Sequence, residues 1–183
     1  MIGSSRVVLW FAVLCLAVVA TAANAEDQRP TVAVLPFTLI DTSLAGQVYG
    51  PQSVESARLR GARTEVAERL AAKGRFHIIN INKTTQETRK VAGKQSLLDC
   101  SSCDTEIARR LGADYVIVGW VQKVSDLILN MNVAFFAVKK PSDVAAASVS
   151  IRGDTNESWA RGARYLVDNV LLPKLARPTS PLH

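Results

Sequence analysis

The sequence contains one C-x-x-C motif, formed by Cys100 and Cys103. Of all its residues, these two most directly suggest a chemical role, which is thiol or disulfide chemistry. In an oxidising compartment such a pair forms a disulfide where the geometry permits, and a thiol near a helix amino terminus can acquire a lowered pKa. Thioredoxin-like enzymes place the motif directly after a strand, whereas Leu97–Asp99 precedes it here, and the Asp99 carboxylate opposes thiolate formation. The spacing therefore favours a structural disulfide, and a thiol-redox accessory protein is the alternative.

The same segment predicts the start of a short helix over residues 104–111. Ser101 and Asp104 stand at the spacing of a capping box, with Asp in place of the usual Glu or Gln. A zinc site is not favoured, because no second cysteine pair supplies further ligands and the two histidines, His77 and His183, lie far away in the sequence. We therefore expect no bound metal and no cofactor.

Motifs that carry established catalytic chemistry are absent from the sequence. There is no G-x-S-x-G, P-loop, G-x-G-x-x-G or H-E-x-x-H. Carboxylates such as Asp41, Asp126 and Asp154 cannot be paired from sequence alone, so glycosidase chemistry is unsupported. These observations favour a protein that is not an enzyme.

A basic segment and a long polar connection are the candidate partner surfaces. The segment Asn80–Lys94 carries four cations, and the connection Thr38–Gln52 is long for a compact domain. The candidate partner-binding residues are Tyr49, Lys83, Arg89, Lys90 and Lys94. These cations suit contact with anionic lipid or with an acidic partner, but export and the few aromatic residues that accompany them argue against nucleic acid. A basic solvated surface without a partner is the simpler interpretation of the same cations.

The amino terminus has the pattern of a cleavable signal peptide. Arg6 precedes an apolar run, and Ala23-Asn24-Ala25 is an A-x-A cleavage site followed by acids. Cys15 lies inside the apolar run after Leu14, which argues against lipidation. We expect cleavage after Ala25, a mature periplasmic domain over residues 26–183, and no stable membrane insertion after cleavage. A retained anchor is the alternative.

The elements that must position these residues follow from hydrophobic patterning. An apolar run at 31–37 and Phe76–Ile79 predict strands, and residues 54–73 have a helical stripe ended by Gly74. A strand at 115–121 is followed by two alternating strands, near 127–138 and 145–151, in the first of which Leu127, Leu129, Met131, Val133 and Phe135 share one face. A last helix begins near Thr155 with Asp154 and Glu157 at capping distance, and Trp159 on its apolar stripe. The segment 38–52 is expected to be an irregular polar connection, and the segment 80–94 a weak helix of a turn or two.

This order predicts one domain of the α/β or α+β class, with a single mixed sheet of about five strands packed by helices. Val32–Phe37 and Ala108–Gly119 resemble corresponding segments of TolB amino-terminal-type domains, of curli-secretion-type lipoproteins and of penicillin-binding-protein-activator lipoproteins. The paired cysteines and Ile151–Trp159 resemble small periplasmic families of unknown function that share this fold. The resemblance covers most of residues 30–172 and implies a cell-envelope interaction domain, whose partner it does not identify.

Overall fold

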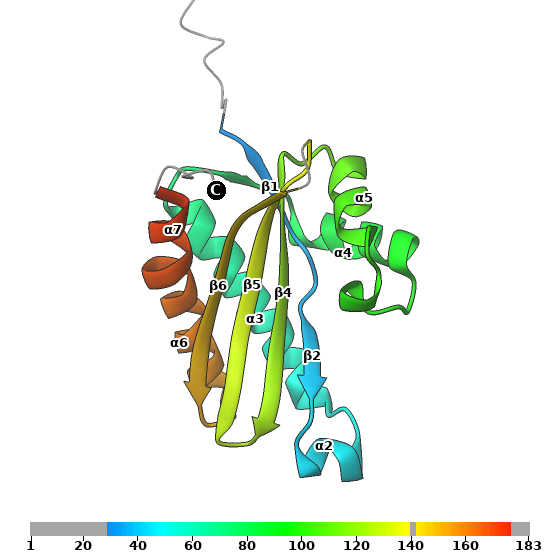
Figure 1. Ribbon diagram of the computed structural model, residues 1–183, viewed down its shortest axis with the longest axis vertical. Helices are drawn as coiled ribbons and strands as arrows, with labels where there is room; N and C mark the ends of the chain where they lie inside the picture. The colour runs from blue at the N-terminus through cyan, green and yellow to red at the C-terminus, as the bar shows by residue number, and fades with distance from the viewer. Residues whose placement is uncertain (1–28, 140–141, 177–183) are drawn as a thin grey trace, which may run out of the picture.

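The computed structural model describes residues 29–139 and 142–176 (Figure 1). Within them the elements are β1 (Thr31–Val34), β2 (Thr38–Asp41), α2 (Leu44–Tyr49), α3 (Ser53–Ala72), β3 (His77–Ile78), α4 (Ile81–Ala92), η2 (Leu97–Asp99), α5 (Cys103–Arg110), β4 (Tyr115–Ser125), β5 (Ile128–Ala137), β6 (Ser142–Arg152), α6 (Asn156–Tyr165), η3 (Leu166–Leu171) and α7 (Leu172–Ala176). The expected signal peptide lies outside the described residues. None of the helices described is long and apolar enough to cross a membrane.

The strands form one mixed sheet in the order β3-β1-β4-β5-β6, with β2 also paired to β4. The pairs β1–β3, β1–β4 and β2–β4 are parallel, whereas β4, β5 and β6 form an antiparallel meander. Early crossovers followed by hairpins are what the element order predicted. The sheet has six strands where about five were expected, because β2 continues along β4 beyond the end of β1.

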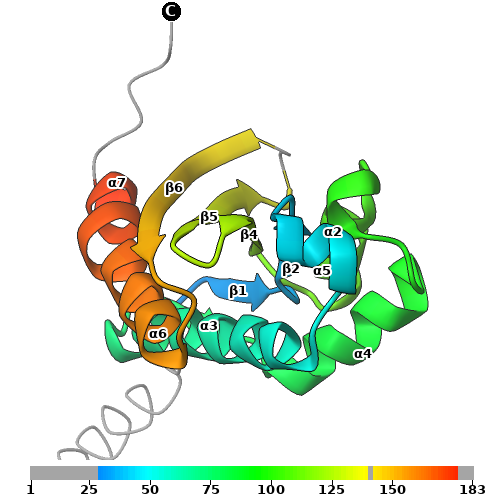
Figure 2. The same ribbon diagram turned by 90° about the horizontal axis from the view of Figure 1, so that it is seen from below.

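Helices cover both faces of the sheet (Figure 2). On one face α3 and the final helix bury the larger core cluster, to which β5 contributes Leu129, Met131, Val133 and Phe135. On the other face α5 packs over Val116 and Val118 in a second cluster. The alternation predicted for β5 is confirmed for these four residues, but Leu127 lies outside the strand and is exposed because it belongs to the β4–β5 turn.

One segment expected to be irregular and one expected to be only a weak helix are both regular. Residues 38–52 contain β2 and α2, and residues 80–94 contain the three-turn helix α4. The Asn80 side chain caps α4 by accepting hydrogen bonds from the N–H groups of Asn82 and Lys83, at 2.9 and 3.4 Å. The buried positions of α4 are Thr84 and Ala92, which an apolar periodicity does not reveal.

A buried arginine explains why a polar helix packs here. Arg63 of α3 donates to the Val34 carbonyl through Nε and Nη2, at 3.0 and 2.7 Å, and to the Ile81 carbonyl at 3.0 Å. It also bonds the hydroxyls of Thr84 and Thr85 on α4. Burial lowers the pKa of Arg63 to about 10. The guanidinium thus joins α3, β1 and α4 by hydrogen bonds.

The capping predicted for the two remaining helices is wrong in detail. Thr155, not Asp154, caps α6, accepting a 3.2 Å hydrogen bond from the Ser158 N–H. At α5 the cap residue is Ser102, without a side-chain hydrogen bond, and Asp104 accepts from the Thr105 N–H instead. The final helix continues from α6 through the π-helical η3 into α7, and Trp159 lies in the core as expected.

Candidate functional site

α2 and the β4–β5 turn lie at the same end of the molecule (Figure 1), and most of the exposed large apolar residues belong to segments at this end. Among the described residues nine large apolar side chains are exposed, and seven belong to this end, which we call the apolar end: Leu44, Val48, Tyr49, Val54, Val124, Leu127 and Ile128. Tyr49, Leu44 and Leu127 are more than 70% exposed, at 77%, 76% and 72%. Single exposed apolar residues are ordinary, whereas several at one end of a molecule make that end a candidate binding surface.

Local sequence explains how α2 presents its part of this end. The Asp41 carboxylate accepts a 2.9 Å hydrogen bond from the Ser43 N–H, and the Ser43 hydroxyl caps α2 by accepting from Gly46 at 3.0 Å. The Thr42 N–H donates to the Lys123 carbonyl at 2.9 Å, which holds the start of α2 beside the end of β4. No residue of α2 itself is buried. The helix is therefore fixed at its start while its apolar side chains remain in solvent.

A buried ionic cluster lies directly behind the apolar end. The Lys123 ammonium of β4 contacts Glu55 of α3 at 2.7 Å, Asp126 of the β4–β5 turn at 2.9 Å and Asp154 after β6 at 3.0 Å. The side chains of Lys123 and Glu55 are only 5% and 3% exposed. Burial opposes the charge of Lys123, but hydrogen bonds to the three carboxylates outweigh it and raise its pKa above the usual value.

Asp154 extends this cluster to the final helix. Its carboxylate also accepts from Arg58 at 2.8 Å and from the Trp159 indole N–H at 2.8 Å. Glu55 has a second role, because its carboxylate accepts from the Gln52 N–H at 3.1 Å in the capping box of α3. Asp126 and Asp154, which the sequence left unpaired, thus meet at one lysine that the sequence analysis missed. Lys123 lies on the same face of β4 as the buried residues Ile117 and Val121. This alternation was the feature of the sequence that could have shown Lys123 to be buried.

This arrangement suits positioning better than turnover. Every charge in the cluster has a partner, and the ion pairs join α3, β4, the β4–β5 turn and the loop after β6. Breaking one partner of such a network leaves an uncompensated buried charge, which is strongly destabilising. The cluster therefore fixes the backbone from which the apolar end projects.

The structure separates Tyr49 from the four predicted basic residues. Lys83, Arg89 and Lys90 are exposed on α4, and Lys94 is exposed just after it, on the flank of the molecule where α4 and α5 lie (Figure 2). Lys90 pairs with Glu87 at 3.1 Å, and Glu87 is also 3.7 Å from Arg110 of α5. We call this surface the basic flank; it contains acids as well as bases.

Cys100 and Cys103 are joined as a disulfide, with their Cα atoms 5.5 Å apart. Cys103 is the first residue of α5 and is buried in the smaller core cluster, and Cys100 packs against the same cluster. In the described part of the chain, no group of three or more His, Cys, Asp or Glu side chains is arranged to hold a metal ion. Of the two histidines, His77 is exposed in β3 and His183 lies outside the described residues.

Solved structures resemble this chain at low identity. Escherichia coli LpoB is 14% identical with a TM-score of 0.51, covering 67% of this chain and 56% of LpoB. TolB from Acinetobacter baumannii is 15% identical with a TM-score of 0.47, covering 82% of this chain and 29% of TolB. Lipoprotein GNA1162 from Neisseria meningitidis is 16% identical with a TM-score of 0.47, covering 79% and 89%. The likeness to LpoB shows a shared fold, in agreement with the expected class.

Among curated proteins no match was found. A protein-family model described as "Protein of unknown function (DUF2380)" matches residues 30–171, which is nearly the whole region expected to form the domain. This agrees with the resemblance to small families of unknown function. The chain is a member of that family.

Proposed function

We propose that the protein is an exported, non-catalytic binding domain of the periplasm whose apolar end contacts another protein of the cell envelope. The observation that carries this proposal is the apolar end itself, because seven exposed apolar side chains are held there on a buried ionic cluster. Exposing them in water is unfavourable unless a partner covers them. Tyr49, selected from the sequence, is part of this surface.

The charges at this end favour a protein partner over a membrane surface. Asp126 lies between Val124 and Leu127 and keeps 69% of its side chain exposed although it pairs with Lys123. Asp41 lies at the start of the same end. Anionic lipid headgroups attract basic surfaces, so carboxylates at this position oppose lipid binding. The partner surface that fits is apolar with basic groups at its rim.

Photo-crosslinking in living cells tests this proposal. A benzophenone amino acid would replace Val48 or Leu127 at the apolar end, and Leu98 would serve as a matched control because it is an exposed leucine in η2, away from this end. We expect the first two positions to give a covalent adduct with the same envelope protein and Leu98 to give none. Identical adducts at all three positions, or none at any, would contradict the assignment of the apolar end.

Export and processing are tested separately. We expect mature protein in the periplasmic fraction to begin at Glu26, because Ala23 and Ala25 satisfy the signal peptidase. Intact-mass measurement reads the amino terminus directly. An intact Met1 chain in the membrane fraction would instead support the retained anchor.

A further inference from the structure

The outer edge of β6 has backbone groups available for another strand. β6 is the last strand in the sheet order and pairs with β5. The Gly153 N–H donates to the Leu127 carbonyl at 3.3 Å, and the antiparallel register therefore directs the backbone N–H and C=O groups of Ser148, Ser150 and Arg152 away from β5. The Lys174 ammonium donates a 2.6 Å hydrogen bond to the carbonyl of Ala146. This carbonyl therefore also points away from β5, as the same alternation requires.

Between Ala145 and Ser150 this edge has little of the protection that natural sheets use, although a register shift lies just before it, between Asp143 and Ala145, and Arg152 lies just after it. Charged residues, proline or bulges normally prevent an edge from pairing with another chain. Between Ala145 and Ser150 the strand contains small residues and one valine, without charge or proline. Lys174 covers one carbonyl, and in the described part of the chain no hydrogen bond is made by the outward backbone groups from Ser148 to Arg152.

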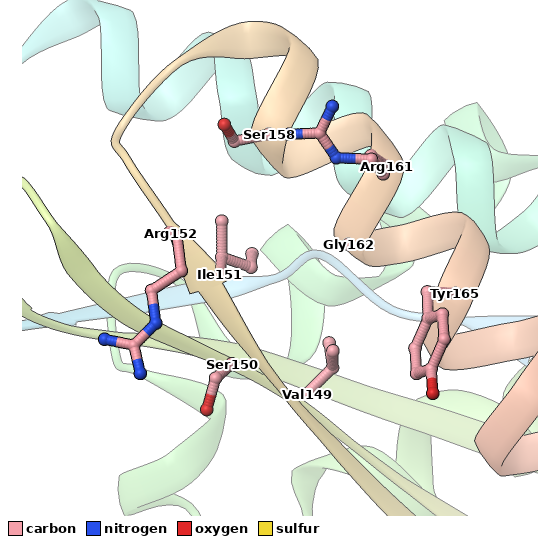
Figure 3. Close-up of a pocket in the computed structure, with 8 residues that line it drawn as sticks. All are labelled: Val149, Ser150, Ile151, Arg152, Ser158, Arg161, Gly162 and Tyr165. Carbon is pink, nitrogen blue, oxygen red and sulfur yellow. The ribbon is translucent and has the colours of Figure 1, made fainter.

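A groove follows the same stretch of β6 (Figure 3). Its volume is about 340 Å³, and it lies between residues 149–152 of β6 and one side of α6. Ser150 and Arg152 line it from one face of the strand, and Val149 and Ile151 from the other, so the hollow runs along the strand edge. α6 contributes Tyr165, which is 53% exposed, together with Ser158, Arg161 and Gly162.

The groove is basic. Arg152 and Arg161 line it, and no carboxylate does. Glu157 at its margin pairs with Arg161 at 3.0 Å, but the two side chains are 81% and 63% exposed, so this pair is weak and exchangeable. Arg152 makes no ion pair in the described part of the chain. Lys174 adds a third cation farther along the edge.

α6 lies unusually close to β6 beside this groove. A Cβ at Gly162 would stand 2.8 Å from Cγ1 and 2.9 Å from Cδ1 of Ile151, so this helix position accepts no larger residue without movement. The close approach brings Arg161 and Tyr165 within reach of any chain laid along the strand edge. The helix thus forms one wall of the groove, and β6 forms its floor.

We propose that the β6 edge from Ser148 to Arg152 binds an extended acidic segment of another protein as an added strand. The segment's backbone would pair with the outward groups of Ser148, Ser150 and Arg152, as in other cases of strand addition. Carboxylates on one face of the segment would pair with Arg152, and apolar side chains on its other face would contact the ring of Tyr165 on α6, beside Arg161. This site adjoins the apolar end, because Arg152 lies opposite Ile128 in the sheet, but the two proposals depend on different side chains and different variants test them, so either proposal can fail alone.

The probe is an eight-residue peptide of alternating valine and glutamate, with binding to the full-length protein measured by fluorescence anisotropy. Two control peptides separate the contributions: one replaces glutamate by lysine, and the other keeps glutamate but carries N-methyl groups on the amides of one edge. We expect the acidic peptide to bind and both controls to bind at least about tenfold more weakly. Equal binding of the N-methylated peptide would overturn strand addition.

Protein variants test the same contacts from the other side. Arg152→Glu with Arg161→Glu should weaken peptide binding at least about tenfold, whereas Arg60→Glu, on the exposed side of α3, should not change it. Ser150→Pro should abolish binding and Ser150→Thr should retain it, because proline removes an outward N–H that β5 does not use. If Ser150→Pro does not fold, the N-methylated peptide still tests that hydrogen bond with the unaltered protein.

Self-association would contradict the proposal in a recognisable way. If β6 pairs with a second copy, sedimentation should show a dimer that Ser150→Pro converts to a monomer, and the acidic peptide should not bind. Binding that survives both arginine reversals would also overturn the assignment, because it would place the peptide elsewhere.

Discussion

The apolar end and the basic flank are both exposed to solvent, but only at the apolar end is the exposure of the side chains unfavourable. On the basic flank Lys83, Arg89 and Lys90 are solvated as charged residues normally are, and Lys90 already has Glu87 as a partner. At the apolar end Leu127 and Tyr49 are exposed against their preference for burial. Exposed charge needs no partner to explain it, whereas clustered exposed apolar surface does.

The two regions also differ in how they are held. Behind the apolar end the ion pairs of Lys123 are buried and shared among several elements. On the basic flank the ion pairs lie at the surface, and α4 is attached to the rest of the molecule through the hydrogen bonds of Arg63. Buried ion pairs shared among several elements suit a surface that must keep one shape in order to bind a partner.

Removing the buried cation should have the largest effect. Lys123→Met leaves Glu55 and Asp154 buried without their ammonium, and we expect a loss of about 3–5 kcal/mol in the free energy of unfolding. Urea unfolding measures this loss. Lys139→Met is the matched control, because Lys139 is 89% exposed and lies 3.7 Å from Asp114, and it should cost less than about 1 kcal/mol. Similar losses in the two variants would show that the cluster is not a buried support.

Partner affinity should distinguish the two surfaces directly. Leu127→Asp should weaken binding to the crosslinked envelope partner at least about tenfold, as expected when an apolar contact residue acquires a charge. Lys83→Glu with Arg89→Glu should change the affinity less than about threefold. Both variants should retain their stability, within about 0.5 kcal/mol, since the residues are exposed. The reverse order of effects would assign binding to the basic flank.

The disulfide beside the basic flank should have a smaller, structural effect. Cys100→Ser with Cys103→Ser should lower the Tm by about 3–6 °C, because the closed loop is short and gains less than the ~3 kcal/mol of a 15-residue loop. Partner binding should remain. A thiol-redox accessory protein predicts the opposite: little change in Tm, loss of function, and a reduction potential near about −120 mV, where a structural bond lies below about −300 mV.

The smallest effect concerns pH. The Thr31 N–H and hydroxyl donate to Asp114 at 3.0 Å each, and these hydrogen bonds lower the pKa of Asp114. A depressed pKa stabilises the folded state above the unfolded pKa of about 3.9, and this stability is lost as the pH falls through the lower folded value. Because 39% of the Asp114 side chain is exposed and solvent screens its charge, Asp114→Asn should cost only about 0.5 kcal/mol at pH 7 and less at pH 2, measured by urea unfolding. An equal cost at both pH values would contradict this account.

Local patterns identified most of the regular elements. The alternation of Leu129, Met131 and Val133 with Asn130 and Asn132 predicted β5, because a strand's side chains alternate between core and solvent faces. The stripe of α3 predicted its burial for the equivalent helical reason. The missed elements β2 and α2, and α4, which was expected only as a weak helix, lack such a stripe. β2 depends on its pairing with β4, and α4 on the polar contacts of Arg63.

The site illustrates the same limit. From the sequence, Tyr49 was assigned to a candidate partner surface, but nothing in the sequence joined it to Leu127 and Val124. Those residues lie at the same end of the molecule because β2 pairs with the end of β4 and the Thr42 N–H bonds the Lys123 carbonyl at the start of α2. Likewise the carboxylates of Glu55 and Asp154 come from segments 68 and 31 residues away from Lys123.

By itself the sequence determined the class of fold, the strands of the antiparallel meander with their core and solvent faces, the helix α3 and a disulfide between Cys100 and Cys103. These features depend on residue type and on spacings of a few residues, which the chain fixes locally. Only the tertiary structure decided which charges are buried together, which apolar residues remain outside, and why Gly119 has no side chain, since the ring of Phe37 occupies that space. The physical reason is that burial and pairing are properties of segments that folding brings together, and no local pattern records them.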